Sequence, residues 1–503
     1  MDNIIETIDQ VAEANPKRIA YDYLGRTNTY GDLKLRSDAW AAKLLTMQLK
    51  PGQPIMVWGG QTFEMIACFL GCVKAGHAYI PIASYSNAER LVMIQEVSHA
   101  SLVIAIDALP DIALPGLQVL RPADVPNQHP AINISQAVHG DDTFYIIFTS
   151  GTTGKPKGVM ISHRNLLSFV NWEQRDFKLP AQPSFLVQAP YSFDLSVMSL
   201  YPALTSGGKL VVLPHDVTQD FKQLFATLPQ LQFNVWVSTP SFAQMCFLDP
   251  TFNSKQHPEL SHFLFCGEEL PHSEVLALEK RFPTSHIFNT YGPTEGTVAV
   301  TQVEITDDIL AKYDRLPIGF AKADTQITLD ETKGEAGQGE LILSGPSVSK
   351  GYLNNPEKTK AAFFRSAGAT DNSYRTGDAG FFAEKQLLFY SGRIDFQVKF
   401  NGYRIELEEI NFYLSQNDLV RYGVVAPKYN RNHTVKQLVA EIELTKAAQD
   451  KYSEAELTRR LRASLAKQVM PYMIPQRFVY RSALPISQNG KVDIKQVIQE
   501  VNQ

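Results

Sequence analysis

Amphipathic and purely apolar segments alternate along the first three quarters of the chain. The segments with apolar residues at helical spacing are 37–50, 241–247 and 273–281, and the short apolar or β-branched runs are 53–58, 144–148, 209–214 and 233–238. Apolar runs of this length are typical of buried strands, and strands that alternate with helices build parallel sheets. The pattern therefore predicts an α/β fold, a body of sheets covered by helices.

The pattern changes twice in the last third. After about residue 322 it becomes short strands with glycine turns, at 326–329 and 339–345, which predicts a β-rich subdomain. Beyond residues 393–396 a new set of elements begins, with a helix from 406, strands at 422–426 and 437–444, a charged helix at 453–469, and a last strand and helix. We expect a large body of residues 1–393 and a small α+β domain of residues 394–503, joined by a short hinge that borders a ligand cleft.

The composition excludes several classes of protein function. The 503 residues are 44% apolar and 20% charged with a net charge of −5, which excludes intrinsic disorder and gives no basic excess for a nucleic-acid partner. The most apolar stretch, residues 65–83, contains Lys74 and His77, so we expect no membrane insertion. The N-terminus lacks a secretory signal and the four cysteines form no Cys-x-x-Cys pair, which predicts reduced thiols and a cytoplasmic location.

A loop suited to phosphate follows the apolar run at 144–148. Residues 149–158 read Thr-Ser-Gly-Thr-Thr-Gly-Lys-Pro-Lys-Gly, with four hydroxyls, three glycines and two lysines. Glycines let the backbone approach a phosphate, while hydroxyls, N–H groups and lysines supply donors and charge. Pro156 after Lys155 excludes a Walker A loop, and no Gly-x-Gly-x-x-Gly follows a strand. A surface loop without function is the alternative. The candidate binding residues are Thr149, Ser150, Gly151, Thr152, Thr153, Gly154 and Lys157.

Four further segments place polar side chains in turns. Residues 289–295 (Asn-Thr-Tyr-Gly-Pro-Thr-Glu) are suited to a nucleotide and its metal, and Asp378 follows a tight turn where it could accept two ribose hydroxyls. Residues 392–395 put a cation, Arg393, at the expected hinge, and Lys491 stands in a glycine-containing loop. Singly, each is compatible with a solvated charge or a turn former. Together, in this order, they favour a nucleotide site.

With these motifs the chain resembles the adenylate-forming superfamily, which includes acyl-CoA synthetases, firefly-type luciferases and adenylation domains of nonribosomal peptide synthetases. The resemblance runs from Thr29-Tyr-Gly-Asp-Leu33 to Lys491. It implies a large N-terminal body, a small C-terminal domain and two half-reactions. In the first, a carboxylate attacks the α-phosphorus of ATP and releases pyrophosphate. In the second, the small domain rotates and a thiol displaces AMP.

The resemblance also implies roles for individual residues. Residues 149–158 would close over the β- and γ-phosphates, Lys491 would bridge the substrate carboxylate and the α-phosphate as the catalytic cation, and Asp395 would be the hinge. Residues 399–404 would line the path of the thiol after rotation. The remaining residues implied at the nucleotide are Asn289, Thr290, Tyr291, Gly292, Thr294 at the α-phosphate, Glu295 at Mg²⁺, and Asp378 with Arg393 at the ribose. ATP and Mg²⁺ are the expected substrate and cofactor.

The segment Tyr-Ser-Phe-Asp-Leu-Ser at 191–196 resembles the amino-acid-activating branch, in which the aspartate pairs with the α-ammonium of the substrate. Burying Asp194 without a cation would be costly, although it could instead cap a helix. The resemblance places Leu195, Met198, Cys266 and Val298 in the pocket wall, and the bulk of Met198 suggests a short substrate side chain. A nucleophilic role for Cys266 is the alternative.

Segments 74–81, 238–242 and 264–270 resemble stand-alone ligases of this branch that act on D-alanine. That resemblance implies that Cys266 favours the D-enantiomer and that the acceptor is a phosphopantetheinylated D-alanyl carrier protein serving teichoic-acid D-alanylation. Because the sequence ends twelve residues after Lys491, we expect a separate carrier or free coenzyme A. Another small amino-acid or short-chain acyl-CoA ligase, and a nucleotide-binding scaffold without turnover, are the competing hypotheses.

Overall fold

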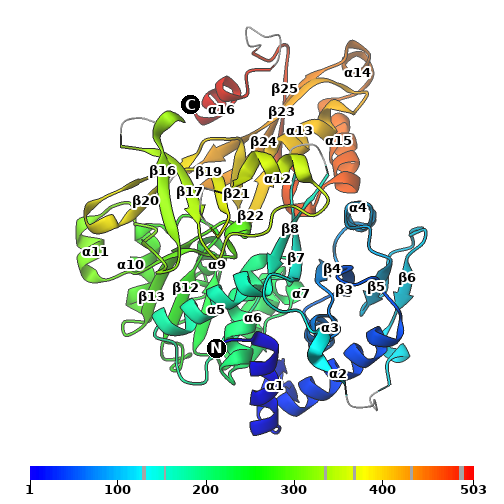
Figure 1. The fold of residues 1–503 in the computed structure, drawn as a ribbon. Coiled ribbons are helices and arrows are strands. Elements are labelled where there is room, and N and C mark those ends of the chain that lie inside the picture. The colour runs from blue at the N-terminus through cyan, green and yellow to red at the C-terminus, as the bar shows by residue number, and fades with distance from the viewer. Residues whose placement is uncertain (127–131, 152–154, 334–336, 366–369, 431–433, 486–491) are drawn as a thin grey trace.

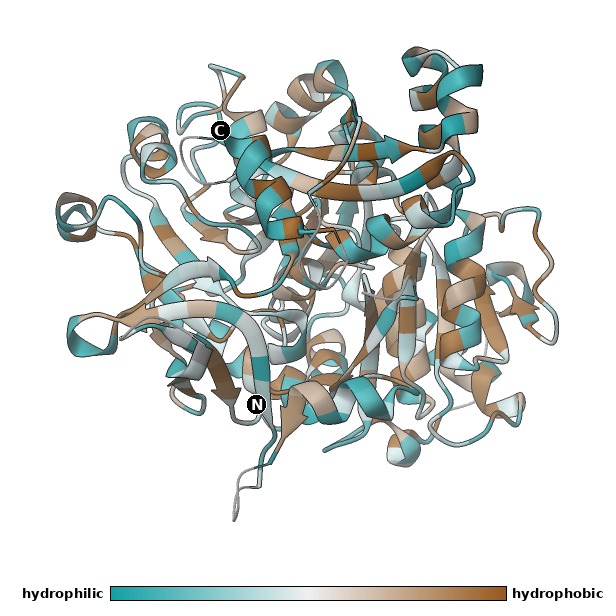
Figure 2. Ribbon diagram, turned by 90° about the horizontal axis from the view of Figure 1, so that it is seen from above, coloured by the Kyte–Doolittle hydropathy of each residue, from teal (hydrophilic) through white to brown (hydrophobic). Residues whose placement is uncertain are grey.

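The computed structural model describes residues 1–126, 132–151, 155–333, 337–365, 370–430, 434–485 and 492–503. Figure 1 shows a lower body of helix-covered sheets and an upper part formed by the end of the chain. In Figure 2 the strands are mostly hydrophobic, whereas helices at the periphery carry hydrophilic residues. The mixed α/β architecture predicted from the sequence is confirmed.

A nine-stranded sheet forms the centre of the body. Its strands are β1 (Ile19–Tyr23), β2 (Arg26–Thr29), β9 (Ser184–Val187), β10 (Lys209–Val212), β11 (Val235–Ser238), β12 (His262–Phe265), β13 (His286–Tyr291), β14 (Thr301–Glu304) and β15 (Phe320–Ala321). The order is β15-β14-β13-β12-β11-β9-β10-β1-β2. The run from β13 to β1 is parallel. The parallel pairing confirms what the alternating pattern predicted.

A second sheet of six strands carries the predicted phosphate loop. It contains β3 (Ile55–Gly59), β4 (Tyr79–Ala83), β5 (Leu102–Ala105), β6 (Gln118–Leu120), β7 (Thr143–Thr149) and β8 (Lys157–Ser162). The order is β6-β5-β3-β4-β7-β8, and only β7 and β8 pair antiparallel. The loop therefore connects two adjacent antiparallel strands.

Helices pack around both sheets. They are α1 (Ile4–Ala14), α2 (Tyr30–Thr46), α3 (Phe63–Lys74), α4 (Ala88–Ser98), α5 (His163–Asp176), α6 (Val197–Thr205), α7 (His215–Thr218), α8 (Phe221–Thr227), α9 (Pro240–Cys246) and α10 (His272–Arg281). The start of α2 lies seven residues before the predicted one, because Thr29 and Asp32 form a capping box there. Among the described residues, no helix is both long and apolar enough to cross a membrane.

The expected β-rich subdomain follows. Short helices α11 (Asp307–Lys312) and α12 (Pro356–Ala362) accompany strands β16 (Gln326–Asp330), β17 (Gly339–Ser344), β18 (Phe363–Phe364), β19 (Ser373–Phe382) and β20 (Leu388–Arg393). All of their pairings are antiparallel. The register of β19 and β20 sets Asp378 directly opposite Arg393.

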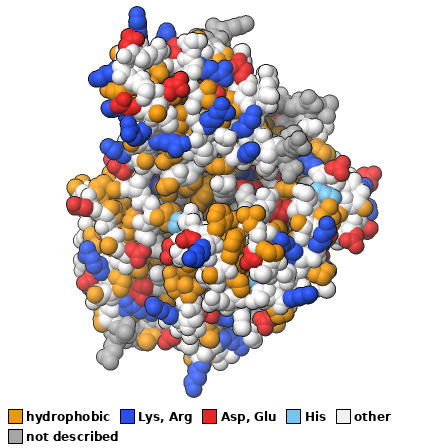
Figure 3. Space-filling model, turned by 180° about the vertical axis from the view of Figure 1, so that it is seen from behind, with side chains coloured by type: hydrophobic (Ala, Val, Ile, Leu, Met, Phe, Trp, Pro, Cys, Tyr) orange, Lys and Arg blue, Asp and Glu red, His pale blue; other side chains and the backbone are white. Residues whose placement is uncertain are grey.

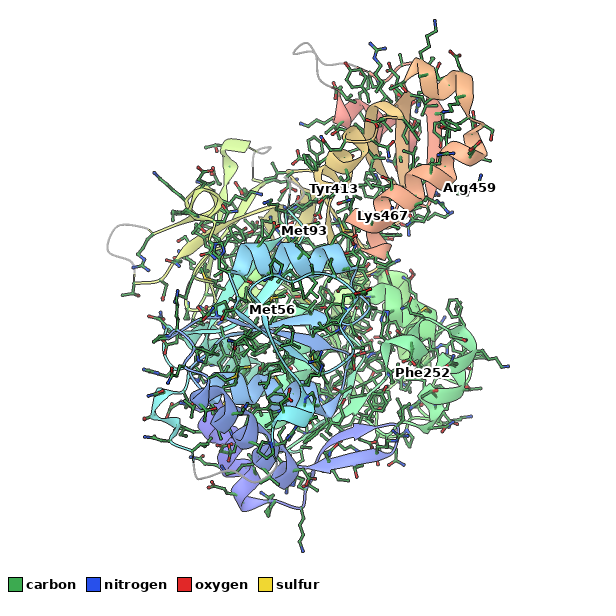
Figure 4. All side chains as sticks on the ribbon, turned by 90° about the vertical axis from the view of Figure 1, so that its right-hand side faces the viewer. Met56, Met93, Phe252, Tyr413, Arg459 and Lys467 are labelled. Carbon is green, nitrogen blue, oxygen red and sulfur yellow. The ribbon has the colours of Figure 1, made fainter. Side chains whose placement is uncertain are left out.

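The C-terminal region, residues 394–503, has its own apolar core. It contains β21 (Gln397–Phe400), β22 (Tyr403–Glu406), α13 (Leu407–Ser415), β23 (Val420–Tyr429), β24 (Val435–Leu444), α14 (Lys446–Lys451), α15 (Glu454–Gln468), β25 (Arg477–Arg481) and α16 (Ile494–Asn502). Its main cluster of buried residues runs from Val398 to Met473 and is separate from the clusters of the body. The region touches the body at α4, where the Tyr413 hydroxyl lies 3.9 Å from the Met93 sulfur (Figure 4).

Candidate active site

A cavity of about 40 Å³ lies where the body meets the C-terminal region. It collects residues from the body, from the hinge and from the C-terminal region; its lining includes Asp194, Leu195, Cys266, Gly292, Thr294, Val298, Asp378, Arg393, Lys399 and Arg404. Eight of these are positions that the sequence pointed to as substrate or nucleotide residues. The fold brings them together although they are spread over 200 residues of the chain.

Asp194 opens a short 3₁₀ turn directly before α6 and is 8% exposed. Burial raises the pKa of its carboxyl, and a hydrogen bond with Thr294 opposes that rise. No described cation is within salt-bridge distance of Asp194. A buried carboxylate of this kind is stabilised by an ammonium group brought by a ligand.

Part of the cavity lining is apolar, formed by Leu195, Cys266 and Val298. Cys266 is 3% exposed, and burial raises the pKa of its thiol, which argues against a thiolate nucleophile. Its Sγ atom lies 3.9 Å from the Val298 carbonyl oxygen. Met198, also predicted for this wall, is fully buried in the core of the body and is not among the described lining residues.

The backbone beside this wall is strained. Thr297 and Val298 have φ angles of +61° and +68°, in the left-handed region that β-branched residues rarely adopt. The Thr297 hydroxyl donates to the Ser347 carbonyl oxygen at 2.7 Å and helps to hold this conformation. Each such residue costs about 1–3 kcal/mol, and strain of this size clusters at functional sites. The sequence pattern did not predict this backbone strain.

Asp378 and Arg393 form the predicted ribose pair. Asp378 is 2% exposed; its Oδ1 atom lies 2.8 Å from Arg393 Nη1, and its Oδ2 atom accepts from the Tyr291 hydroxyl at 2.6 Å. Arg393 also contacts Asp395, the predicted hinge residue: its Nε atom donates to Asp395 Oδ1 at 2.7 Å. Although burial alone lowers the pKa of a guanidinium, Asp378 and Asp395 raise the pKa of Arg393. Asp378, Arg393 and Asp395 thus form a row of linked ion pairs at the border between the body and the C-terminal region.

The rest of segment 289–294 supports this row of ion pairs. The Asn289 amide donates to the Pro317 carbonyl oxygen at 2.7 Å, and the Thr290 hydroxyl donates to the Phe265 carbonyl oxygen at 2.8 Å. A Cβ atom at Gly292 would lie 2.5 Å from the Cα atom of Ala299, so only glycine fits. Asn289 and Thr290, predicted at the nucleotide, use their side chains to fasten neighbouring segments and do not line the cavity.

The described part of the predicted phosphate loop contacts acidic side chains of the C-terminal region. The Gly151 N–H donates to Glu409 Oε2 at 3.0 Å, and Lys157 Nζ lies 3.0 Å from Glu406 Oε1. Ser150 is buried beside them, and the Thr149 hydroxyl, also buried, has no hydrogen-bond partner among the described residues. Thr152, Thr153 and Gly154 lie outside the described residues.

Glu295, the predicted metal ligand, is fully buried and faces Arg404 of the C-terminal region. Arg404 Nη1 lies 2.6 Å from Glu295 Oε2, and the Tyr352 hydroxyl donates to Oε1 at 2.8 Å. Burial would raise the pKa of this carboxyl, but Arg404 and Lys157 outweigh burial and lower it to about 2. A carboxylate that stays ionised and faces a cation is suited to a metal ion.

The described residues contain no group of three or more His, Cys, Asp or Glu that could hold a metal by themselves. Mg²⁺ commonly takes one or two protein carboxylates and completes its shell with water and substrate phosphates. Glu295 beside the predicted phosphate loop fits that pattern.

Lys491 lies outside the described residues. Its described neighbours are held within the C-terminal region, where the Leu484 N–H donates to Glu443 and the Asp493 N–H donates to the Pro485 carbonyl oxygen at 2.9 Å. By contrast, Lys399 and Arg404, from the segment expected to line the path of a thiol, reach the cavity.

A larger cavity of about 560 Å³ adjoins the first at the junction. Phe193 and Leu195 line both cavities. Several aromatic rings line the larger cavity. Tyr403 stacks on Tyr472, with 3.7 Å between the ring centroids, and on Phe193, with 5.7 Å between the centroids. Figure 3 shows hydrophobic side chains gathered around a hollow between the upper and lower parts of this face.

Sequence reasoning assigned no role to several residues of the site, namely Glu268, Tyr352, Glu406 and Glu409. Glu268 joins the two regions, because its carboxylate accepts from the N–H groups of Gly402 at 2.7 Å and Ser241 at 2.9 Å. The sequence could have indicated Glu406 and Glu409 through the charged residues of segment 404–409, which the structure places at buried positions of a strand and a helix.

The sequence model of a family described as AMP-binding enzyme matches residues 8–353. The D-alanine--D-alanyl carrier protein ligase of Lactiplantibacillus plantarum is 53% identical, and the alignment covers 99% of both chains. The ligase of the same name from Streptococcus pneumoniae is 47% identical, over 99% of this chain and 98% of that one.

Solved structures share the fold. A nonribosomal peptide synthetase protein containing adenylation and PCP domains superposes with a TM-score of 0.82 at 26% identity, over 99% of this chain and 84% of that chain. The adenylation domain AlmE of Vibrio cholerae, in complex with glycyl-adenosine-5'-phosphate, gives a TM-score of 0.81 at 24% identity, over 99% of this chain and 97% of that chain. The second likeness concerns the fold alone.

Proposed function

Because the chain belongs to the AMP-binding enzyme family, we propose that it is a ligase that activates D-alanine with ATP and transfers the product to a carrier protein. The observation that carries the proposal is the small cavity that is lined both by Asp194, which has no described cation beside it, and by the pair Asp378–Arg393. An amino acid brings the ammonium that Asp194 needs, and the ribose hydroxyls of a nucleotide suit Asp378. The printed names of the relatives supply D-alanine and the D-alanyl carrier protein.

The first half-reaction joins the two substrates. A carboxylate oxygen of D-alanine attacks the α-phosphorus of ATP, and the bond to the β-phosphate oxygen breaks, which gives D-alanyl-AMP and pyrophosphate. Lys491 bridges the carboxylate and the α-phosphate, where negative charge grows in the transition state. Ser150, Gly151 and Lys157 bind the departing phosphates. Glu295 would hold a Mg²⁺ ion, which would supply positive charge to neutralise them. Thr294 contacts the α-phosphate.

The second half-reaction passes the acyl group to sulfur. The thiol of a phosphopantetheinylated carrier attacks the carbonyl carbon, and AMP leaves as the thioester forms. We propose that residues 394–503 move as a small domain about Asp395, and that the position of Lys399 and Arg404 at the cavity belongs to this second step. We assign the pantetheine arm to the 560 Å³ cavity at the junction, which shares Phe193 and Leu195 with the smaller cavity. Two features favour the cytoplasm as the site of reaction. ATP is the substrate, and the four buried cysteines are free thiols. The product would serve lipoteichoic acid D-alanylation.

The test is pyrophosphate exchange in the presence of D-alanine, L-alanine, glycine or acetate. We expect exchange with D-alanine at the highest kcat/KM. A preference for acetate would replace the proposal with the alternative of a short-chain acyl-CoA ligase, and a preference for another amino acid would replace only the substrate. Transfer of labelled D-alanine to a purified holo carrier, with the carrier lacking phosphopantetheine as control, tests the second step.

A further inference from the structure

Residues 297–299 form a γ-turn in the lining of the small cavity. The Ala299 N–H donates to the Thr297 carbonyl oxygen at 2.8 Å, and Val298, at the centre of the turn, has a φ of +68°. A γ-turn with a positive φ at its centre is the rare and strained form, and a β-branched residue at that position adds to the strain. Val298 lines the cavity. The strained residue is therefore itself part of the wall assigned to the substrate.

The turn places the carbonyl group of Val298 close to two other residues of the lining. The carbonyl oxygen lies 3.9 Å from Cys266 Sγ, and a Cβ atom at Gly292 would lie 2.8 Å from the same oxygen. Cys266 and Gly292 also line the cavity. The backbone conformation of Val298 thus decides how closely this part of the lining packs.

A side-chain hydrogen bond holds the turn from outside the cavity. Thr297 is 0% exposed, and its hydroxyl donates to the Ser347 carbonyl oxygen at 2.7 Å. Among the described residues, no other donor bonds to that oxygen. Segment 346–349 is held from its other side, because Asn165 Nδ2 donates to two of its carbonyl oxygens, at 2.7 and 3.0 Å. The Thr297 hydroxyl therefore ties the strained turn to a segment that is itself fixed.

We propose that Thr297 is a positioning residue that limits the size of the substrate side chain. Thr297 is not among the described residues that line the cavity, and it acts through Val298. A strained backbone persists only where its surroundings hold it, so loss of the bond to Ser347 lets the turn relax. Relaxation moves Val298 out of the wall and leaves room for a larger side chain. This inference rests on the proposed function, because that function gives this wall to the side chain of alanine.

The primary experiment compares D-alanine with D-2-aminobutyrate, which is one methylene larger, in pyrophosphate exchange. One methylene in a pocket typically changes kcat/KM about 10–200-fold. Thr297→Val keeps the shape of the side chain and removes the hydroxyl, and we expect it to lower the ratio of the two kcat/KM values about tenfold. The KM for D-alanine should rise while kcat stays, because the wall contributes binding shared by ground and transition states. An unchanged ratio overturns the inference.

Two further variants separate the hydroxyl from a general effect on the fold. Thr297→Ser keeps the hydroxyl and should keep the wild-type ratio. Thr301→Val is the matched control, because Thr301 is also 0% exposed and its hydroxyl donates to the Ile318 carbonyl oxygen at 2.5 Å, outside the cavity lining. It should leave the ratio unchanged, since a loss of stability lowers kcat/KM for both acids alike. A fall in the ratio in Thr301→Val, or in Thr297→Ser as large as in Thr297→Val, contradicts the proposal.

Thr297→Gly keeps the proposal testable if Thr297→Val does not fold. Glycine adopts the φ of +61° found at this position without strain, so the fold is retained while Val298 loses its tie to Ser347. The ratio should fall as in Thr297→Val, and tryptophan fluorescence in a urea titration checks that each variant is folded. A wild-type ratio in folded Thr297→Gly overturns the inference.

Exchange with the wild-type protein separates this inference from the proposed function. If exchange does not depend on D-alanine, the proposed function fails. If D-alanine supports exchange but the wild-type protein accepts D-2-aminobutyrate equally well, or the Thr297 variants keep the wild-type ratio, only the inference fails.

Discussion

Two buried carboxylates of the site, Asp378 and Glu295, are each paired with an arginine, but the pairs are built differently. Arg393 is the register partner of Asp378 on the neighbouring strand, so sheet hydrogen bonds fix that pair. Arg404 comes from β22 of the C-terminal region and reaches Glu295 across the junction. The first pair is part of the folded body, whereas the second exists only while the two regions are docked.

The difference indicates a division of labour. Under the proposed function, groups that keep their geometry through both half-reactions lie within one sheet, and groups that serve one half-reaction lie between the two regions. Substitutions in the two kinds of pair and in the groups around them, together with a pH titration, test this division.

Lys491→Ala should produce the largest loss. Removing a cation from a developing negative charge typically costs on the order of 10²–10³ in rate, so pyrophosphate exchange should fall by this factor. Transfer from preformed D-alanyl-AMP to the carrier should be much less affected, because the docked arrangement uses Lys399 and Arg404 at the cavity. Equal losses in exchange and transfer would contradict a role confined to the first step.

Asp378→Asn should destabilise the body. Removing one partner of a buried ion pair leaves the other charge uncompensated, which costs about 3 kcal/mol of unfolding free energy. All four tryptophans lie before residue 394, so their fluorescence in a urea titration reports the body.

Arg404→Ala supplies the contrast to Asp378→Asn in the same titration. Its effect on the tryptophan transition should stay below about 1 kcal/mol, because under the proposed function the C-terminal region moves relative to the body, which lets water reach Glu295. Similar losses in the two variants would show that both pairs belong to the body.

Asp194→Asn should weaken recognition of the amino acid. Losing the charge opposite a buried ammonium costs about 2 kcal/mol, which raises the KM for D-alanine about thirtyfold in pyrophosphate exchange. The KM for ATP is the internal control and should change little, because the nucleotide groups stay in place. A parallel rise in both KM values would indicate a general distortion of the cavity.

The docked contact should also depend on pH. Burial raises the pKa of Glu409 from 4.5 to about 7, against the opposing charges of Arg90 and Lys157 and the Gly151 hydrogen bond, with Glu406 adding to the rise. Because the raised pKa belongs to the docked state, docking takes up a proton, so docking is strongest below pH 4.5 and weakens as the pH rises toward 7.

Energy transfer between dyes on cysteines introduced at the exposed residues Leu248 and Arg459 measures this effect without added ligand; the four native cysteines are buried. From pH 5.5 to 7.5 we expect the docked fraction to fall by at most about tenfold per pH unit. Glu409→Gln should flatten the profile, since it removes the titrating group. A wild-type profile that rises with pH, or one that the variant leaves unaltered, would contradict the assignment.

The sequence determined the elements and the chemistry of the motifs. Alternating apolar runs predicted the parallel strands, and the glycine- and hydroxyl-rich loop after residue 148 predicted a phosphate site, because spacing and residue type act locally. The missed start of α2 shows the limit of apolar periodicity, since a polar capping box set the boundary.

The tertiary structure decided which charges meet. Only folding brings Glu406 and Glu409 to Lys157 and Gly151, about 250 residues away, and sets Arg404 against Glu295. It also placed Met198 in the core, and it placed the side chains of Asn289 and Thr290 in hydrogen bonds to neighbouring segments and not at the cavity. Local pattern cannot show such pairings, because whether a buried charge has a partner depends on the packing of distant segments.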